Sequence, residues 1–342
     1  MPRPTIKDLA AAANLSVTTI NRVLHEPKTV KQVTRELVLE AAERIGFYGI
    51  GAITSNIRVK TRVFRLGILL LQNRRVFYST LATALEKAAK DYSDHEISLR
   101  MEFMDDLSPD KIAERMLKLG ENCDAISIVS AEHPIVSEAI GTLAEKGVPV
   151  YALISPLSAR VPVGFVGIDS WKVGRTSAWA FDNLCRQPGK IGILVGSHRY
   201  RCQELNESGF RSYFREHERG FELLEPKLTF EDSAIAREQT EMILNSHPDL
   251  VGLYISGGGI TGAIKALNES GRAKQLVTVG YDMTEITRSA LLSGVLNFVV
   301  AHPLATLAHQ LISAMIKSVI SEPETAPLTI TLPFDIFVSE SI

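Results

Sequence analysis

Hydrophobic residues follow two different patterns along this chain of 342 residues. In the first 48 residues they recur at helical spacing in three short segments. From Arg65 onward, short apolar runs of strand length alternate with longer amphipathic segments. The first pattern predicts a small all-α domain over residues 1–48, and the second predicts parallel β-sheets with helical connections over residues 66–342. Residues 49–65 are then a hinge or linker.

The first two predicted helices lie within residues 5–24, TIKDLAAAANLSVTTINRVL. Thr5 is the expected N-cap of the first helix, with Asp8 placed to complete a capping box, and Ser16 is the expected N-cap of the second. The buried faces are expected to hold Ile6, Leu9, Ala10 and Ala13 in the first helix, and Ile20, Val23 and Leu24 in the second. This arrangement predicts a helix-turn-helix, with an ordinary helical hairpin as the alternative.

A third amphipathic helix is predicted over residues 34–45, with Gly46 as its stop signal. Its apolar side is expected to hold Val33, Leu37, Ala41 and Ile45. Three such helices can share one small core, which would fix the exposed face of the second helix. That face carries small or hydrogen-bonding side chains able to reach base edges in a major groove, namely Val17, Thr18, Asn21 and Arg22.

These residues, together with TRELVLEAAERIGF at residues 34–47, resemble the lactose-repressor (LacI/GalR) family of bacterial transcription regulators. The two blocks occur in the right order and at the right separation, and the resemblance extends over nearly the whole chain. It implies a sequence-specific regulator, a repressor, that binds double-stranded operator DNA as a homodimer. In this interpretation Val17, Thr18, Asn21 and Arg22 contact bases, and Thr5, Ser16, Lys31 and Thr34 contact phosphates.

Charge is distributed unevenly along the chain. Residues 1–65 hold 11 Lys and Arg against 5 Asp and Glu, whereas the remainder holds 26 against 34. A basic head on an acidic body suits a module that contacts phosphates, although a solvated basic terminus would have the same sign. Three scattered cysteines without metal-ligand spacing, no signal peptide and no apolar run of transmembrane length lead us to expect a cytoplasmic protein.

The linker differs from that of the family. Relatives follow the third helix with a Pro-Asn pair and an Ala-Arg-x-Leu stretch, whose leucine enters the minor groove. Here the segment is GIGAITSNIRVKTRVFR, with Gly49 and Gly51 making a helix costlier to form. Ile57 is the candidate for the minor-groove wedge. A flexible basic linker that follows the phosphate backbone is the equal alternative.

The remainder of the chain predicts an α/β domain. Strands are expected at 66–71, 125–130, 148–154, 165–168, 191–196, 250–256, 276–282 and 296–301, and helices at 81–92, 110–119, 135–146, 172–184, 260–268 and 303–320. About 275 residues suffice for two parallel sheets, with a ligand cleft at the carboxyl ends of their strands. This resembles the periplasmic-binding-protein-like (type I) effector domain of the same family, with two Rossmann-like lobes. The second lobe is expected to begin near Val166 and the return crossing to fall near Leu296.

The family resemblance implies a small polar effector, a sugar or cyclitol, in this cleft. Asp282 ends a Gly-Tyr-Asp motif like the one whose aspartate binds effector hydroxyls in relatives. Asn206 stands where many relatives have an effector-binding arginine, which Arg199 or Arg201 can replace. Other expected contacts are Phe77, against the face of a sugar ring, Ser256, in place of the family's Asn-Asp, and His302, in place of its Gln-Asp-Pro.

One motif supports a different function. Residues 257–262 contain G-x-G-x-x-G after a predicted strand, and Asp282 follows 20 residues later, as in NAD(P)-dependent oxidoreductases. Only about 60 residues follow Asp282, and the motif lies late in the chain, so this interpretation is the weaker one. No catalytic motif is found, and we expect no enzyme activity, cofactor or metal. A sugar-binding protein without a DNA role is a third hypothesis.

Overall fold

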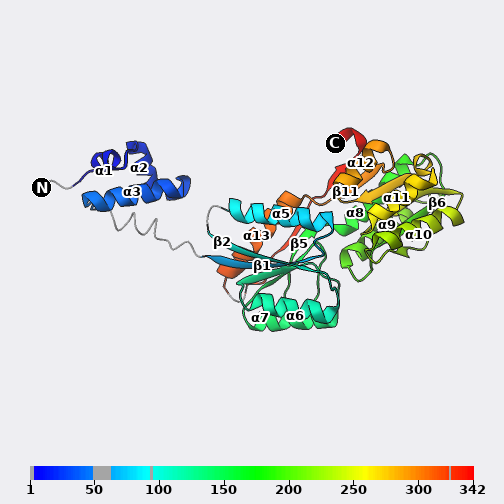
Figure 1. The fold of residues 1–342 in the computed structure, drawn as a ribbon, viewed down its shortest axis with the longest axis horizontal. Helices are drawn as coiled ribbons and strands as arrows, with labels where there is room; N and C mark the ends of the chain where they lie inside the picture. Colours follow the sequence, from blue (N-terminus) through cyan, green and yellow to red (C-terminus); the bar gives the residue numbers. More distant parts are fainter. Residues whose placement is uncertain (1–3, 49–62, 93–94, 323–324) are drawn as a thin grey trace. The chain divides into compact units, whose positions relative to one another are not determined.

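The structure, a computed structural model, describes residues 4–48, 63–92, 95–322 and 325–342. The chain divides into two compact units, one formed by residues 1–64 and 91–98 and the other by residues 65–90 and 99–342. Figure 1 shows the helices of the head and the two sheets, which are parallel except that β13 (Asp335–Phe337) runs antiparallel to β11 (Phe298–Ala301). The predicted fold class, an N-terminal helix-turn-helix followed by a two-lobed α/β domain, is confirmed.

The head contains the helices α1 (Ile6–Ala13), α2 (Val17–His25) and α3 (Gln32–Ile45), with a short 3₁₀ turn η1 (Pro27–Thr29) between the last two. The predicted caps are confirmed. Thr5 Oγ1 accepts a hydrogen bond from the Asp8 backbone N–H, and Asp8 Oδ2 accepts one from the Thr5 N–H at 2.7 Å. Ser16 Oγ accepts from the Thr19 N–H at 3.1 Å. Gly46, at φ 67°, ends α3 in the left-handed conformation that favours glycine.

The core of the head differs from prediction in α3. Its fully or nearly fully buried residues are Leu9, Ala10, Ile20, Val23, Val38, Ala41, Ala42 and Phe47. Val33 and Leu37, expected to be buried, are 69% and 48% exposed. Residues four apart advance 400° around a helix, so a series at 33, 37, 41 and 45 drifts across its surface. Packing against α1 and α2 selects the face of Val38, Ala41 and Ala42 instead.

The first lobe is built on a six-stranded sheet of order β12-β5-β4-β3-β1-β2. Its strands are β1 (Phe64–Leu71), β2 (Ile97–Met104), β3 (Ala125–Ile128), β4 (Val150–Leu153), β5 (Gly164–Ile168) and β12 (Thr329–Leu332). Its helices are α5 (Val76–Asp91), α6 (Pro109–Gly120), α7 (Pro134–Glu145) and α13 (Leu304–Ile320). Helices α6 and α7 cover one face of the sheet, and α5 and α13 cover the other (Figure 1). Strands buried on both faces are continuously apolar, as predicted.

The second lobe is built on a seven-stranded sheet with the path β13-β11-β10-β9-β6-β7 and with β8 paired to β6. Its strands are β6 (Lys190–Val195), β7 (Glu222–Leu223), β8 (Lys227–Leu228), β9 (Leu250–Ile255), β10 (Val277–Tyr281), β11 (Phe298–Ala301) and β13 (Asp335–Phe337). Its helices are α8 (Ser170–Leu184), α9 (Arg201–Glu216), α10 (Ser233–Ser246), α11 (Ile260–Ser270) and α12 (Glu285–Ser293), with short 3₁₀ turns η2 (Ala273–Gln275) and η3 (Ser339–Ser341).

Successive residues of β9 show how the second sheet is covered. Leu253 and Ile255 join the core formed with α10, α11 and α12. Tyr254, between them, stacks on Phe210 of α9 with ring centroids 4.5 Å apart and lies 6.4 Å from Phe181 of α8. Alternate residues of a strand point to opposite faces, so both faces of this sheet are packed by helices.

The chain passes between the lobes three times. It leaves the first sheet after β5, returns after β11, and crosses again between β12 and β13. The predicted beginning of the second lobe near Val166 and return near Leu296 are each displaced, since Val166 lies in the first sheet and β11 is still part of the second. The edge strands β2, β12 and β13 were not predicted, because half-exposed strands lack the continuous apolar run that marks a central one.

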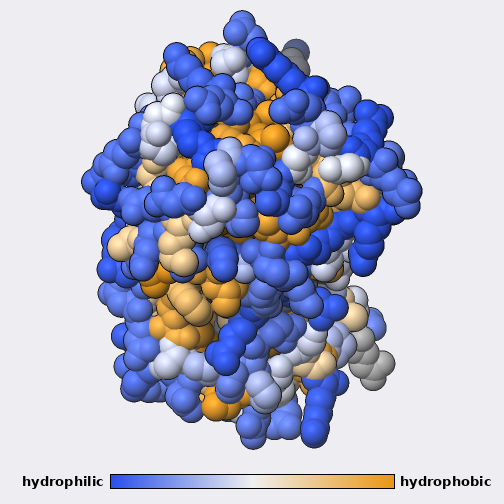
Figure 2. Space-filling model, turned by 90° about the vertical axis from the view of Figure 1, so that its right-hand side faces the viewer, coloured by the Kyte–Doolittle hydropathy of each residue, from blue (hydrophilic) through white to orange (hydrophobic). Residues whose placement is uncertain are grey.

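The surface is mainly polar in the view of Figure 2, where apolar side chains gather in separate areas among hydrophilic ones. In the part of the chain that the structure describes, no helix is both long and apolar enough to cross a membrane.

Candidate functional site

A cavity of about 510 Å³ lies between the two lobes. Both sheets have the doubly wound strand order in which the first strand lies between the second and the third, and the cavity opens where the connections of each sheet diverge. The loops after β9, β10 and β11 contribute, respectively, Ser256, Asp282 and His302 to its lining, and the first turn of α5, which follows β1, contributes Phe77. Four of the six predicted effector contacts are therefore brought together here.

Asp282 and His302 form a hydrogen-bonded pair in the wall of the cavity. Asp282, at φ 61°, follows β10, and its Oδ1 accepts from His302 N at 3.1 Å and lies 2.8 Å from His302 Nδ1. Because His302 Nδ1 faces this carboxylate oxygen, the second ring nitrogen, Nε2, is left to hydrogen-bond elsewhere. This Nε2 is buried and has no hydrogen-bond partner among the described residues. It is thus available to a ligand hydroxyl.

Apolar and weakly polar groups complete the same wall. The ring of Phe77, from the first lobe, lies 5.6 Å from the His302 ring, and that of Tyr281 lies 5.5 Å from it. Ser256 is buried, and its Oγ has no partner within the described ranges. Burial raises the pKa of the Cys202 thiol to about 12, so this lining residue stays protonated and is not an activated nucleophile.

Arg201 and Asn206, two of the predicted effector contacts, are not among the residues that line the cavity, so their role as effector contacts stays a prediction. Asn206 lies in the second turn of α9, is fully buried, and sits in the interface with α8, where a Cβ on Gly174 would come within 1.9 Å of its carbonyl oxygen. Arg201 is exposed at the start of the same helix, with Nη1 3.5 Å from Ser158 Oγ of the first lobe. Both residues belong to α9, which begins at Arg201 and packs against α8.

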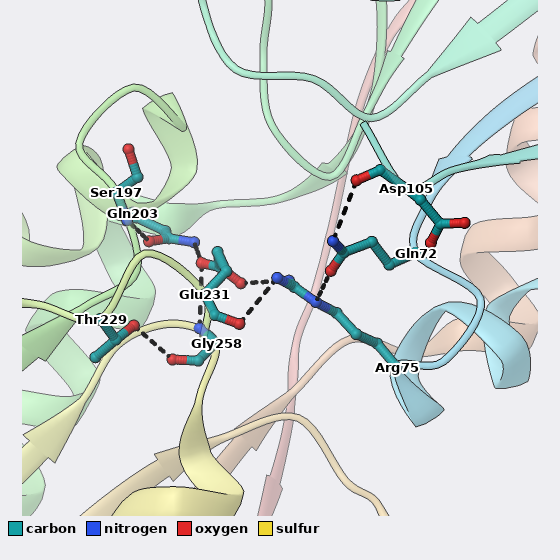
Figure 3. A network of polar contacts seen from close by, with 8 residues as sticks. All are labelled: Gln72, Arg75, Asp105, Ser197, Gln203, Thr229, Glu231 and Gly258. Atoms are coloured by element: carbon teal, nitrogen blue, oxygen red, sulfur yellow. Dashed lines mark hydrogen bonds and ion pairs between the residues drawn. The ribbon is translucent and has the colours of Figure 1, made fainter. Parts of the chain in front are cut away.

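The sequence interpretation missed a second polar pair, Arg75 and Glu231, which lines the cavity. Arg75 Nη1 donates to Glu231 Oε2 at 2.7 Å, and Nη2 donates to the Glu231 backbone carbonyl at 2.9 Å. Gln72 orients the guanidinium by accepting from Arg75 Nε at 3.0 Å (Figure 3). Arg75 follows β1 in the first lobe and Glu231 follows β8 in the second, so the pair joins the lobes. A separation of 156 residues leaves no local sequence signal for it.

The glycine-rich turn after β9 faces this glutamate. The Gly258 N–H donates to Glu231 Oε1 at 3.2 Å, and a Cβ on Gly258 would lie 1.9 Å from Glu231 Oε2. Gly262 approaches the Ser233 carbonyl oxygen so closely that a Cβ there would lie 1.8 Å from it. A Cβ on Gly257 would lie 2.7 Å from Gly196 N, and Gly259 has a φ of 88° and lies against Asp232. The motif glycines are thus explained by packing without a dinucleotide, while Gly258, at a variable position of the motif, contacts Glu231.

Two further hydrogen bonds connect the lobes beside the cavity. The Glu132 N–H donates to the Arg199 carbonyl at 2.8 Å, and the Cys202 N–H donates to Ser155 Oγ at 3.3 Å. Together with the Arg75–Glu231 pair, they connect the two lobes beside the cavity.

In the head, the predicted base-contacting residues lie on one side of α2. Val17, Thr18, Asn21 and Arg22 are exposed, whereas Ile20 and Val23 of the same helix are fully buried. Arg22 is engaged within the head, since its Nη2 donates to the Thr29 carbonyl at 2.7 Å and its Nε to Thr29 Oγ1 at 3.2 Å.

The predicted phosphate contacts surround this helix. Thr5 and Ser16 are exposed caps of α1 and α2, Lys31 is exposed before α3, and Thr34 is half-buried in its first turn. Ile57 and most of the predicted hinge, residues 49–62, lie outside the described residues. Within the described ranges, no group of three or more His, Cys, Asp or Glu side chains is arranged to hold a metal ion.

Comparison with known proteins gives two family matches. Residues 5–49 match the family of bacterial regulatory proteins, lacI family, and residues 68–322 match the periplasmic binding protein domain. Catabolite control protein A of Priestia megaterium is 30% identical over 166 residues, so the chain spans 47% of that relative and the match covers 48% of this chain. The ribose operon repressor of Halalkalibacterium halodurans is 23% identical over 290 residues, covering 81% of this chain and 80% of the relative.

Solved structures share the fold of the two-lobed domain. GanP, a glucose-galactose binding protein from Geobacillus stearothermophilus, has a TM-score of 0.72 at 18% identity and covers 81% of this chain and 99% of its own. A solute binding protein from Bacillus halodurans, solved with bound myo-inositol, has a TM-score of 0.70 at 18% identity and covers 81% and 95%. The chain therefore belongs to the periplasmic binding protein domain family over residues 68–322, and it carries a lacI-family helix-turn-helix head at residues 5–49.

Proposed function

We propose that this protein is a sequence-specific DNA-binding transcriptional regulator, a repressor, controlled by a small polar effector bound between its two lobes. One observation carries the proposal: a capped helix-turn-helix that exposes Val17, Thr18 and Asn21 occurs in the same chain as a cavity lined by unpartnered polar groups. A regulator needs both parts, whereas a free sugar-binding protein needs only the cavity.

The DNA-binding proposal rests on the rigidity and charge of the head. Buried Ile20 and Val23 hold one side of α2, so the opposite side is presented in a fixed orientation. We assign base contacts to Val17, Thr18, Asn21 and Arg22, and phosphate contacts to Thr5, Ser16, Lys31 and Thr34. Ile57 is proposed as a minor-groove residue on the sequence alone. A homodimer on a palindromic operator, in the cytoplasm, completes the proposal.

The effector is proposed to be a sugar or cyclitol. His302 Nε2 and Ser256 Oγ are buried polar atoms without partners among the described residues, and leaving such atoms unpaired is costly. Ligand hydroxyls would satisfy them, while Phe77 offers an apolar surface to the C–H groups of a ring. The ribose operon repressor, the glucose-galactose binding protein GanP and the neighbour solved with myo-inositol support this ligand class.

The oxidoreductase hypothesis is disfavoured by the glycine-rich turn. A dinucleotide would place its pyrophosphate against the backbone N–H groups of this turn. Here Gly258 N–H donates to a carboxylate of the chain itself, and a pyrophosphate would meet the charge of Glu231. We therefore propose a regulator and not an enzyme.

Selection from a random double-stranded DNA library tests the proposal. We expect a palindromic consensus for the wild-type protein, its loss in Asn21→Ala, and its retention in Glu40→Ala, which removes an exposed side chain of α3. Thermal shift with D-galactose, D-ribose and myo-inositol tests the cavity, because a ligand at 100 times its Kd stabilises a protein by about 2.7 kcal/mol. Sugar binding without DNA selection would favour the free binding protein, and a shift with NADH alone would favour the oxidoreductase.

A further inference from the structure

Glu231 has a left-handed backbone conformation, which residues other than glycine rarely adopt. Phe230 and Glu231 are consecutive non-glycine residues with φ values of 47° and 62°. Each such residue costs of the order of 1 kcal/mol and persists only where surrounding contacts compensate for it. The Phe230 side chain is mostly exposed, so the compensating contacts belong mainly to Glu231.

Those contacts surround the carboxylate with oriented donors (Figure 3). Glu231 Oε1 accepts from Gln203 Nε2 at 2.5 Å and from Gly258 N–H at 3.2 Å, and Oε2 accepts from Arg75 Nη1 at 2.7 Å. Each neutral donor is itself held in place. Gln203 Oε1 accepts from the Ser197 N–H at 2.8 Å, and Thr229 Oγ1 donates to the Gly258 carbonyl at 2.8 Å.

The backbone at Gly196 and Gly258 lies close to this carboxylate, so side chains at these two positions would collide with it. A Cβ on Gly196 would lie 1.7 Å from Glu231 Oε1, and a Cβ on Gly258 would lie 1.9 Å from Oε2. Two glycines from separate strand ends, β6 and β9, therefore border one carboxylate. The Glu231 side chain is only 11% exposed and that of Arg75 is 20% exposed, so water screens their attraction weakly.

We propose that Glu231 acts as a built-in anionic ligand, which occupies the anion-binding position of the glycine-rich turn and, through Arg75, holds the two lobes closed in the absence of an effector. The pair joins loops that follow β1 and β8 in different lobes, so separating the lobes requires breaking it. Breaking it leaves two charges that have lost their partners in a partly buried setting, which is strongly unfavourable.

The same arrangement restricts the charge of the ligand, an extension that rests on the proposed function. Two arginines and three carboxylates line the described cavity, namely Arg74, Arg75, Glu231, Asp232 and Asp282. Arg75 is already neutralised by Glu231. Arg74 then opposes Asp232 and Asp282, so a phosphorylated or acidic ligand would meet one excess negative charge, whereas a neutral polyhydroxylated ligand would not. The cavity is therefore assigned to uncharged ligands.

Chemical rescue tests the built-in ligand without DNA or effector. Glu231→Gly removes the carboxylate and relieves the positive φ. Phe230→Gly relieves the neighbouring φ alone and is the matched control. We expect the melting temperature to fall by about 4 °C or more in Glu231→Gly, and to stay level or rise in Phe230→Gly. Acetate should then restore stability to Glu231→Gly relative to equal sodium chloride.

A second variant distinguishes the effect of losing the negative charge of Glu231 from the effect of losing its side-chain volume. Glu231→Gln fills the position without a negative charge, so we expect a lowered melting temperature that acetate does not restore. Hydrogen exchange of peptides that contain Arg75 or Gly258 should be faster in both Glu231 variants than in wild type or Phe230→Gly. Equal stability of Glu231→Gly and Phe230→Gly, with no specific effect of acetate, would overturn the proposal.

Ligand charge is tested by thermal shift with D-galactose and with D-galactose 6-phosphate. Stabilisation of the wild-type protein by the neutral sugar alone supports the assignment, and stabilisation by the phosphate ester overturns it. Failure of both sugars counts against the proposed effector class, while the acetate experiment still decides whether Glu231 is a built-in ligand. The two proposals can therefore fail separately.

Discussion

At the scale of single residues, Asp282 and Arg22 were predicted to contact external ligands and also contact the protein itself. Asp282 holds His302 through two hydrogen bonds, and Arg22 binds both the carbonyl and the hydroxyl of Thr29. A side chain that is already held loses less conformational entropy when it binds a ligand, so such contacts favour recognition. They also make a substitution act in two ways, and the experiments must separate these.

Asp282→Ala should abolish the effector response and leave operator binding unchanged. Loss of a charged hydrogen-bond acceptor, and of the contact that orients His302, should weaken effector binding by about 10-fold to 100-fold. Isothermal titration with the sugar identified by thermal shift measures this, and operator affinity measured by fluorescence anisotropy is the control. Normal release of the variant from DNA by the effector would remove Asp282 from the site.

Arg22→Ala should relax specificity at one base pair of the operator, at a cost of about 1–3 kcal/mol. Thr29→Val is the matched control, because it removes the hydroxyl that Arg22 Nε contacts but keeps the arginine. Competition binding to operators changed at single positions measures the effect. An equal loss on every DNA sequence would assign Arg22 to a phosphate, and an equal loss in Thr29→Val would assign it to support of the head.

At the scale of elements, the head is defined by helix ends. Thr5 and Ser16 cap α1 and α2, Asn14 takes the left-handed conformation between them at φ 54°, and Gly46 ends α3. These ends use local hydrogen bonds within a few residues of sequence. For that reason sequence reasoning placed them correctly, whereas it misplaced the buried face of α3, which depends on contact with α1 and α2.

Two substitutions of Ser16 distinguish its role as a helix cap from its proposed contact with a DNA phosphate. Ser16→Gly should cost only a few tenths of a kcal/mol, because glycine is tolerated at an N-cap, while Ser16→Ala should cost about 1 kcal/mol. Hydrogen exchange of the α2 amides reports helix stability, and anisotropy reports operator affinity. Weak DNA binding by a stable Ser16→Gly protein assigns the hydroxyl to a phosphate. Full binding by that variant would leave Ser16 with capping alone.

At the scale of the whole molecule, the basic residues are concentrated in the DNA-binding head, whereas the cavity is formed by contacts between the two lobes. The basic residues of the first 65 positions oppose an acidic remainder. The cavity, in contrast, depends on loops from both lobes, and residues as distant in sequence as Phe77 and His302 meet there. Binding of DNA should therefore depend strongly on salt, and binding of a neutral effector should not.

Lys31→Ala tests this division. Removal of one phosphate contact should weaken binding to all DNA sequences about equally and reduce the slope of log affinity against log salt by about 1. Titrations between about 50 and 200 mM salt, on the operator and on an unrelated sequence, measure the slope. The matched control is Lys265→Ala, an exposed lysine of α11. An unchanged slope in Lys31→Ala would show that Lys31 does not contact a phosphate.

The sequence by itself determined the class of the protein, because its signals act over short distances. Caps, the alternation of apolar runs with helical segments, and the two blocks within residues 5–47 all depend on neighbouring residues. The tertiary structure alone decided that Arg75 pairs with Glu231, that Asp282 holds His302, and that the Asn206 backbone packs against α8. These contacts join residues tens to more than a hundred positions apart or depend on the face that a helix buries, and a single sequence carries no local pattern that encodes them.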